Sequence, residues 1–486
     1  MNRIVGPSQW SVRGRAQGVH PDRAPFWNWG GDVPVAFGSG LWKNFATTRP
    51  MNDSTTQPPN RIPARRRWIL ALVVVGVIGI AGWIWATGGT RSLAAHRQAL
   101  RAQGWPGSVA ELNARRKPVP GKPSGVDRLI SLARAGAEAD PELEKKLFQG
   151  PAPLSVPMAR RQELRRVVRE SARQSGGLCS ELDKDWFALM LSYLRLGQEV
   201  HGVALEAEVR ADWQEVVEGV LDLIDIGSVL DAEIAGEFSG LRAFPEEKAI
   251  HSLLPSLAGR PIGETNWMRI QEALSRREGV PSLQMSGLGG HLAALDQIEA
   301  MPGSLWKQWA DGGNLPRFGW KRVRVLFQMP GIPGEMLEDE LERFAMMARP
   351  LPECLQGVAA VWQRRMGRFR GSALEALGMG WMIDQSEVGY AYRLLTVRLG
   401  MALCAVERFR LRQSGAIPTD LSEVTTGPDP LLARVPLDPF TGQPLVLERI
   451  DGGYLLRRPP IPIPGKARED DESGRERMEL RVRSDR

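Results

Sequence analysis

The chain has 486 residues, of which 43% are hydrophobic and 24% charged, with a formal net charge of +7. A chain of this length forms about two to four domains and has enough apolar surface for a core. Three cysteines exclude a small scaffold held together by several disulfides. The lack of a collagen-like repeat and the ordinary glycine and proline content exclude a fibrous protein and a chain that is disordered throughout.

The first predicted region is a basic N-terminal tail, residues 1–67. It holds ten Lys/Arg and three Asp/Glu, and so accounts for the whole net charge of +7. Because the rest of the chain is neutral overall, we expect no nucleic-acid partner. Residues 1–50 are rich in Gly, Pro and Trp without any periodic pattern, which predicts disorder. Met51 opens the polar stretch that follows, so we expect that it is the true start and that residues 1–50 are either disordered or not made.

Residues 68–87 contain no charged side chain. As a helix rising about 1.5 Å per residue they would span roughly 30 Å, the thickness of the hydrocarbon core of a bilayer. Arginines stand before this run, and indole rings, which favour the membrane interface, lie near its ends. The predicted anchor residues are Arg65, Arg66, Arg67, Trp68, Trp83 and Trp85.

This pattern predicts one transmembrane helix that acts as an uncleaved signal anchor, with the lipid bilayer as a partner. Basic residues are denser before the span than after it, which predicts an N-terminus in the cytoplasm. We therefore expect a single-pass protein of the inner membrane of a cell envelope, with its C-terminal domain outside the cytoplasm.

Residues 91–424 are predicted to form an irregular helical extracytoplasmic domain. The clearest helix is 385–412, where apolar residues recur every three or four positions and form one stripe. Further helices are expected at 163–173, 185–196, 199–238, 246–257, 267–277, 337–347 and 355–370. Residues 287–320 are the least regular part, and we expect loops and short helices there.

Residues 425–486 are predicted to form a small antiparallel β module with a polar C-terminal tail. The stretches 445–450 and 454–458 flank Asp451-Gly452-Gly453 and predict a β-hairpin. The alternating stretch 478–483 is a candidate third strand. The fold class expected for the whole chain is thus mainly α, with one transmembrane helix and a helical ectodomain that ends in the β module.

A turn motif, VPLDPFTGQPL, precedes the hairpin, and the chain between 385 and 483 resembles the tail of a widespread group of uncharacterised single-pass bacterial envelope proteins. More distantly, it is similar to the C-terminal end of type II secretion major pseudopilins. The resemblance implies a shared β module. Its motif residues are Asp438, Pro439, Phe440, Gly442 and Pro444.

In pseudopilins, acidic residues of the late loop help to hold calcium, and Asp470 and Asp471 stand in a comparable place. A solvated run of charges is the better interpretation, because calcium takes six to eight oxygen ligands and no spaced acidic loop is present. We therefore expect no cofactor and no metal.

The residues that most often carry chemistry form no known motif. The five histidines, His20, His96, His201, His251 and His291, are far apart, so a zinc site would have to be assembled from distant residues. Cys354 and Cys404 form either a disulfide or two buried thiols. The carboxylates between 206 and 233 are expected to form a solvated helix face.

The sequence therefore predicts a membrane-anchored envelope protein that binds or organises protein partners and is not an enzyme. The first alternative is an envelope hydrolase with a cleft built from distant carboxylates. The second is an accessory component of a secretion or pilus system.

Overall fold

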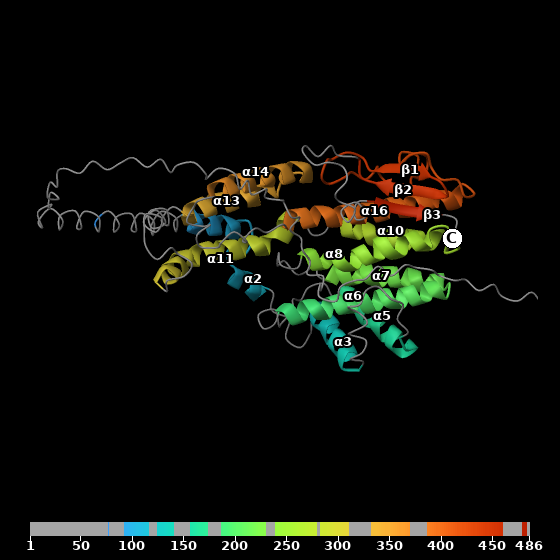
Figure 1. Cartoon of the computed structure of the whole chain (residues 1–486), viewed down its shortest axis with the longest axis horizontal. Helices are drawn as coiled ribbons and strands as arrows, with labels where there is room; N and C mark the ends of the chain where they lie inside the picture. Colours follow the sequence, from blue (N-terminus) through green and yellow to red (C-terminus); the bar gives the residue numbers. More distant parts are fainter. Residues whose placement is uncertain are drawn as a thin grey trace, which may run out of the picture. The chain divides into compact units, whose positions relative to one another are not determined.

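The computed structural model describes residues 76, 92–115, 124–139, 156–173, 186–229, 239–278, 282–310, 332–369, 386–459 and 479–483. All of them belong to one compact unit that begins at Leu70. After a helix over residues 92–102, the elements are α2 (Val109–Arg115), α3 (Gly125–Ala139), α5 (Met158–Arg173), α6 (Trp186–Val209), α7 (Trp213–Val229), α8 (Ser239–Glu247), the π-helix η3 (Lys248–Leu253), α9 (Leu254–Leu257), α10 (Gly263–Glu278), α11 (Leu283–Ala310), α13 (Ile332–Met346), α14 (Leu351–Phe369), α16 (Ser386–Arg412), β1 (Val446–Ile450), β2 (Gly453–Arg457) and β3 (Glu479–Arg483) (Figure 1).

The predicted fold class is wrong in one respect, the transmembrane helix. Among the helices in the described ranges, none combines the length and the apolar character that crossing a membrane requires. Of the predicted span 68–87, only Gly76 is described, and the basic tail 1–67 lies outside the described residues. The fold is therefore classed as mainly helical with a small C-terminal sheet, and the membrane and signal-anchor assignments are withdrawn.

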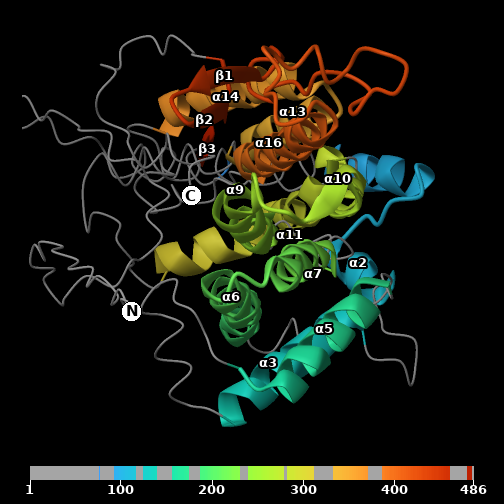
Figure 2. The ribbon, with the colours of Figure 1, turned by 90° about the vertical axis from the view of Figure 1, so that its right-hand side faces the viewer.

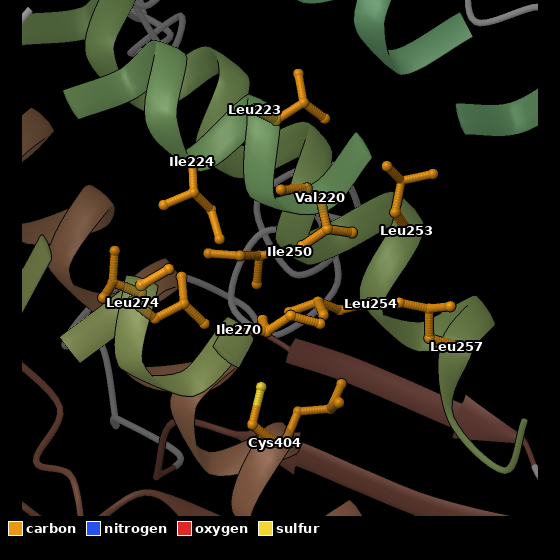
Figure 3. Close-up of a cluster of buried hydrophobic side chains, with 14 of the residues drawn as sticks. Val220, Leu223, Ile224, Ile250, Leu253, Leu254, Leu257, Ile270, Leu274 and Cys404 are labelled. Carbon is orange, nitrogen blue, oxygen red and sulfur yellow. The ribbon is translucent and has the colours of Figure 1, made fainter. Parts of the chain in front are cut away.

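The main hydrophobic core lies where α7, η3, α10 and α16 pack together. Figure 3 shows Ile224 of α7, Ile250 of η3, and Leu274 of α10 pointing toward one another. Each of these side chains is at most 1% exposed. The predicted stripe of α16 is confirmed, because Leu395, Leu399, Ala402 and Val406 are fully buried. Gly400, also on α16, allows a close approach, since a Cβ there would lie 3.0 Å from a methyl group of Leu274.

Helices α3, α5 and α6 extend the main core beyond α7. Helix α3 contacts α5 and α6, and both α5 and α6 contact α7 (Figure 2). A second core joins the helix 92–102 to α2, α11, α13 and α14. The two cores are connected through α16, which contacts both α11 and α14.

The predicted hairpin and third strand are confirmed. β1, β2 and β3 form an antiparallel sheet in that order, with Leu447 opposite Leu456 and Leu456 opposite Leu480. The sheet contacts α16 through β2 and contacts α9 through β3. The Tyr454 hydroxyl of β2 donates to Glu407 Oε1 of α16 at 2.9 Å, inside the core.

The single helix predicted over 199–238 is wrong, because the structure breaks it between α6 and α7. Ala211 takes a left-handed conformation with φ 57°, and the Asp212 amide donates to the Ala207 carbonyl at 2.9 Å. The Asp212 carboxylate then accepts from the Glu215 amide at 3.2 Å, which caps the start of α7. Residues 230–238 lie outside the described residues.

The loops predicted within 287–320 are also corrected, since α11 is continuous from Leu283 to Ala310. In the structure, Gly287 permits close packing, because a Cβ there would lie 2.5 Å from the Met347 sulfur. Tertiary packing therefore outweighed the weak local helix propensity.

Candidate functional site: an arginine-lined pocket

The site begins with the arginines of α5. Five of its six arginines form ion pairs with carboxylates, in four cases across to α6 or α7. Arg160 contacts Glu199 at 3.1 Å, Arg161 pairs with Glu206, and Arg165 contacts Glu215 at 3.0 Å. The sixth is Arg173, the last residue of α5, which is exposed and has no hydrogen bond or ion pair among the described residues.

These pairs correct the expectation that the carboxylates between 206 and 233 form a solvated face. Asp222 is only 4% exposed, and it accepts hydrogen bonds from Arg165 at 3.1 Å and from Arg169 at 3.2 Å. Glu218 pairs with Arg169 and, at 3.0 Å, with Arg269 of α10. The carboxylates of α7 therefore join α5 and α10 to α7. Asp231 and Glu233 lie outside the described residues.

A pocket with a cavity volume of about 560 Å³ opens beyond these pairs, between α5, α7 and α10. Its lining includes five arginines, Arg169, Arg173, Arg269, Arg276 and Arg277, against two carboxylates, Asp225 and Glu272. Its volume lies within the range of about 300–1,000 Å³ that is usual for small-molecule sites. The lining of this pocket, which we call the arginine pocket, is therefore rich in arginine.

The arginines of the pocket fall into two groups. Arg169 and Arg269 are held by Glu218, and Arg277 donates to Glu246 Oε1 at 2.5 Å. Arg173 and Arg276 are exposed and have no hydrogen bond or ion pair with any described residue. Two guanidinium groups are thus available to a ligand, and the other three are fixed by the protein.

Apolar side chains complete the lining of the arginine pocket. Leu221 and Ile224 come from α7, Ala273 comes from α10, and Ala172 comes from α5. Ile224 and Ala273 are buried members of the main core, so this surface is rigidly supported. The pocket therefore offers an apolar surface beside a cationic one.

Asp225 is the titratable acid of the pocket. The pKa of Asp225 is raised from 3.8 to about 6, mainly because the group is buried and also because the nearby Asp222 carboxylate is negatively charged. The positive charges of Arg276, Arg169 and Arg173 act in the opposite direction. The pocket consequently gains positive charge when the pH falls below about 6.

The VPLDPFTGQPL motif is a structural turn, and it lies outside the arginine pocket. Asp438 is fully buried and accepts from the Phe440 amide at 3.2 Å and from the Thr441 hydroxyl at 2.7 Å. Leu437 bridges Pro444 across the turn, and Gly442 takes a left-handed conformation with φ 71°. Arg458 lies over the Phe440 ring and 3.2 Å from Asp438. Pro439 lies within this turn.

The remaining predicted site residues are not brought into any described site. Arg65, Arg66, Arg67, Trp68, Trp83 and Trp85 lie outside the described residues, and so do Asp470 and Asp471. Cys354 and Cys404 are both buried free thiols, which settles the alternative left open by the sequence. In the described part of the chain, no group of three or more histidine, cysteine or acidic side chains gathers at one place.

Sequence reasoning missed the arginine pocket. The density of arginines in α5 was visible, but their partners are 39 to 57 residues away in the chain. Arg169 and Arg173 lie near the end of α5, and Arg276 and Arg277 lie in the last turn of α10, whereas Arg269 lies near the middle of α10. A search for arginines near the ends of neighbouring helices, with fewer acids than bases, could have found the pocket.

The fold and the site define a mainly helical protein with a C-terminal antiparallel sheet and a cationic pocket. The chain matches no protein-family model, and neither a curated protein nor a solved structure is significantly similar to it. The resemblance to envelope proteins and pseudopilins therefore stays a prediction, as does the extracytoplasmic location.

Proposed function

We propose that this chain is a binding protein whose arginine pocket holds an organic anion. The observation that carries this proposal is the pair Arg173 and Arg276, two exposed guanidinium groups that form no hydrogen bond or ion pair with any described residue and lie beside an apolar surface. Guanidinium groups bind carboxylate, sulfonate and phosphate groups in a planar, two-pronged fashion. The apolar lining favours a ligand that also has a hydrophobic body.

The structure of the pocket also bears on the hydrolase alternative. Asp225, with its raised pKa, has the character of a general base. Its neighbour Ser228 does not complete a nucleophilic pair, because the Ser228 hydroxyl donates to the Asp225 backbone carbonyl at 2.7 Å. The described lining residues include no histidine and no cysteine. Binding is therefore better supported than catalysis.

The first prediction concerns the two unpaired arginines. We expect naphthalenesulfonate, an anion with an aromatic body, to bind the full chain. The double variant Arg173→Gln/Arg276→Gln should weaken this binding roughly a hundredfold or more, because each of the two lost hydrogen bonds to a charged group costs about 1.5–3 kcal/mol. Isothermal titration calorimetry measures this affinity.

The matched control variant is Arg166→Gln. Arg166 is also an exposed arginine of α5, but it pairs with Glu170 at 3.1 Å and does not line the pocket. Two further ligands separate the contribution of the anionic group from that of the apolar body. Hydroxymethylnaphthalene has the apolar body but is neutral, and inorganic sulfate is an anion without an apolar body. Equal affinities in the double variant and in Arg166→Gln would contradict the proposed function.

The second prediction is the pH dependence of this binding. The pKa of Asp225 is raised to about 6, so lowering the pH through this value neutralises its carboxylate and removes a negative charge from the pocket. The sulfonate probe keeps its charge over the same interval, so its affinity is expected to rise as the pH falls from about 7.5 to about 5. Titration calorimetry across this interval checks the result. In Asp225→Asn the affinity should be high throughout, and an unaltered pH profile in that variant would exclude Asp225 as the cause.

A further inference from the structure

Two histidines that are 195 residues apart in the sequence meet in the second core. His96 lies on the helix over residues 92–102, and His291 lies on α11. Their Nε2 atoms are 3.0 Å apart, and their ring planes are inclined at 86°. Two ring nitrogens of the same kind therefore face each other across a short gap.

His291 is held in a fixed orientation. Its Nδ1 atom lies 2.9 Å from Glu340 Oε1 of α13, and its ring stacks on Phe344 with a centroid distance of 4.0 Å. Because a carboxylate accepts hydrogen bonds, it keeps the imidazole proton on Nδ1. The lone pair of His291 Nε2 is then directed at His96.

The helix that carries His96 is fixed to α11 by an ion-pair cluster. Arg97, the next residue, contacts Asp296 and Glu299 of α11, each at 2.7 Å. This cluster sets the position of the His96 backbone relative to His291. The His96 ring is partly exposed, whereas His291 is fully buried, so the pair is reached from the His96 side.

The charges behind the histidine pair favour a cation. Glu340 pairs with Arg343 at 3.2 Å, and Arg343 pairs with Glu387 at 2.6 Å. All three are at most 7% exposed, and together they carry two negative charges and one positive charge. A net negative charge of this kind stabilises a divalent ion at the other side of His291.

From these observations we infer that His96 and His291 are the two protein ligands of a divalent transition-metal ion, with zinc as the best fit. Zinc binds imidazole nitrogen at about 2.0–2.1 Å, so two nitrogens on a tetrahedral ion stand roughly 3.4 Å apart. The observed Nε2–Nε2 separation of 3.0 Å is that of a hydrogen bond, so the partly exposed His96 ring must turn away from His291 to admit the ion. A histidine that binds such an ion usually donates a hydrogen bond from its other ring nitrogen to a carboxylate, which orients the ring.

Water or an external ligand completes the coordination, because no third histidine, cysteine or acidic side chain joins the pair among the described residues. Such an ion keeps open positions, which distinguishes it from a closed structural zinc site. The alternative use of the pair is a hydrogen bond from His96 to His291. The two arrangements differ in their response to added metal.

The test uses the full chain after treatment with a chelator, titrated with zinc chloride by calorimetry and with cobalt chloride by visible absorption. We expect one ion per chain and the absorption bands of cobalt with nitrogen ligands. The variants His96→Ala and His96→Asn should each weaken binding at least tenfold. Glu340→Gln should weaken it about 10–100-fold, because the carboxylate orients His291.

The matched control is His251→Asn, since His251 is also partly exposed but lies 3.3 Å from Thr396 in the main core. It should bind zinc as the unmodified chain does. Circular dichroism establishes whether each variant is folded. If His96→Ala does not fold, His96→Asn takes its place in the test. The inference is overturned if the unmodified chain binds neither zinc nor cobalt, or if folded His96 variants bind zinc with unchanged affinity.

Discussion

The Glu246→Gln variant is expected to lose about 3–5 kcal/mol of unfolding free energy, because removing one partner of a buried ion pair leaves an uncompensated charge. Glu246 Oε1 accepts from Arg277 at 2.5 Å, and its Oε2 accepts from Arg393 at 2.8 Å. The exposed fractions are 0% for Glu246, 3% for Arg277 and 4% for Arg393. Glutamine has the same shape but no charge, so the attraction that holds the two guanidinium groups beside each other would be lost.

This carboxylate joins three elements that are far apart in the chain. Glu246 belongs to α8, Arg277 to α10 and Arg393 to α16. Arg393 also donates to the Arg277 carbonyl at 3.2 Å. Since Arg277 lines the arginine pocket, the same substitution should loosen one wall of the proposed binding site.

Urea unfolding, monitored by tryptophan fluorescence, measures the unfolding free energy that Glu246→Gln is expected to lose. The matched control is Glu170→Gln, which removes an exposed pair with Arg166 at 3.1 Å and should cost less than about 1 kcal/mol. If Glu246→Gln were no more destabilising than Glu170→Gln, the triad would not stabilise the fold as described.

Replacing Trp267 with alanine is expected to cost about 3–5 kcal/mol, the usual result of truncating a large buried aromatic side chain. Trp267 lies on α10, is 1% exposed and belongs to the main core. Its removal leaves a cavity that the packed helices around it cannot fill without moving.

The next residue provides the control for this variant. Met268 is 39% exposed on the same helix, so Met268→Ala should change the unfolding free energy far less. Both variants alter side-chain volume at neighbouring positions of α10, and therefore differ mainly in burial. Thermal unfolding followed by circular dichroism measures the two effects, and equal losses would show that α10 does not pack as described.

Local patterns in the sequence were sufficient for much of the secondary structure. The apolar stripe of α16 and the turn between β1 and β2 follow from short-range rules, because helix and strand periods and glycine-rich turns involve only neighbouring residues. The two errors have different causes. The break at Ala211 depends on a local cap that Asp212 supplies to α7, whereas the continuity of α11 depends on a long-range contact, the fit of Gly287 against Met347.

Composition and periodicity alone identified a mainly helical chain with a C-terminal hairpin, since both properties are encoded over a few residues. The candidate sites have a different origin. Arg173 and Arg276 line the same pocket, and His96 contacts His291, through the packing of helices whose separation along the chain is large. Periodicity indicates which face of a helix is buried, but the identity of the helix that covers this face depends on side-chain packing between distant segments.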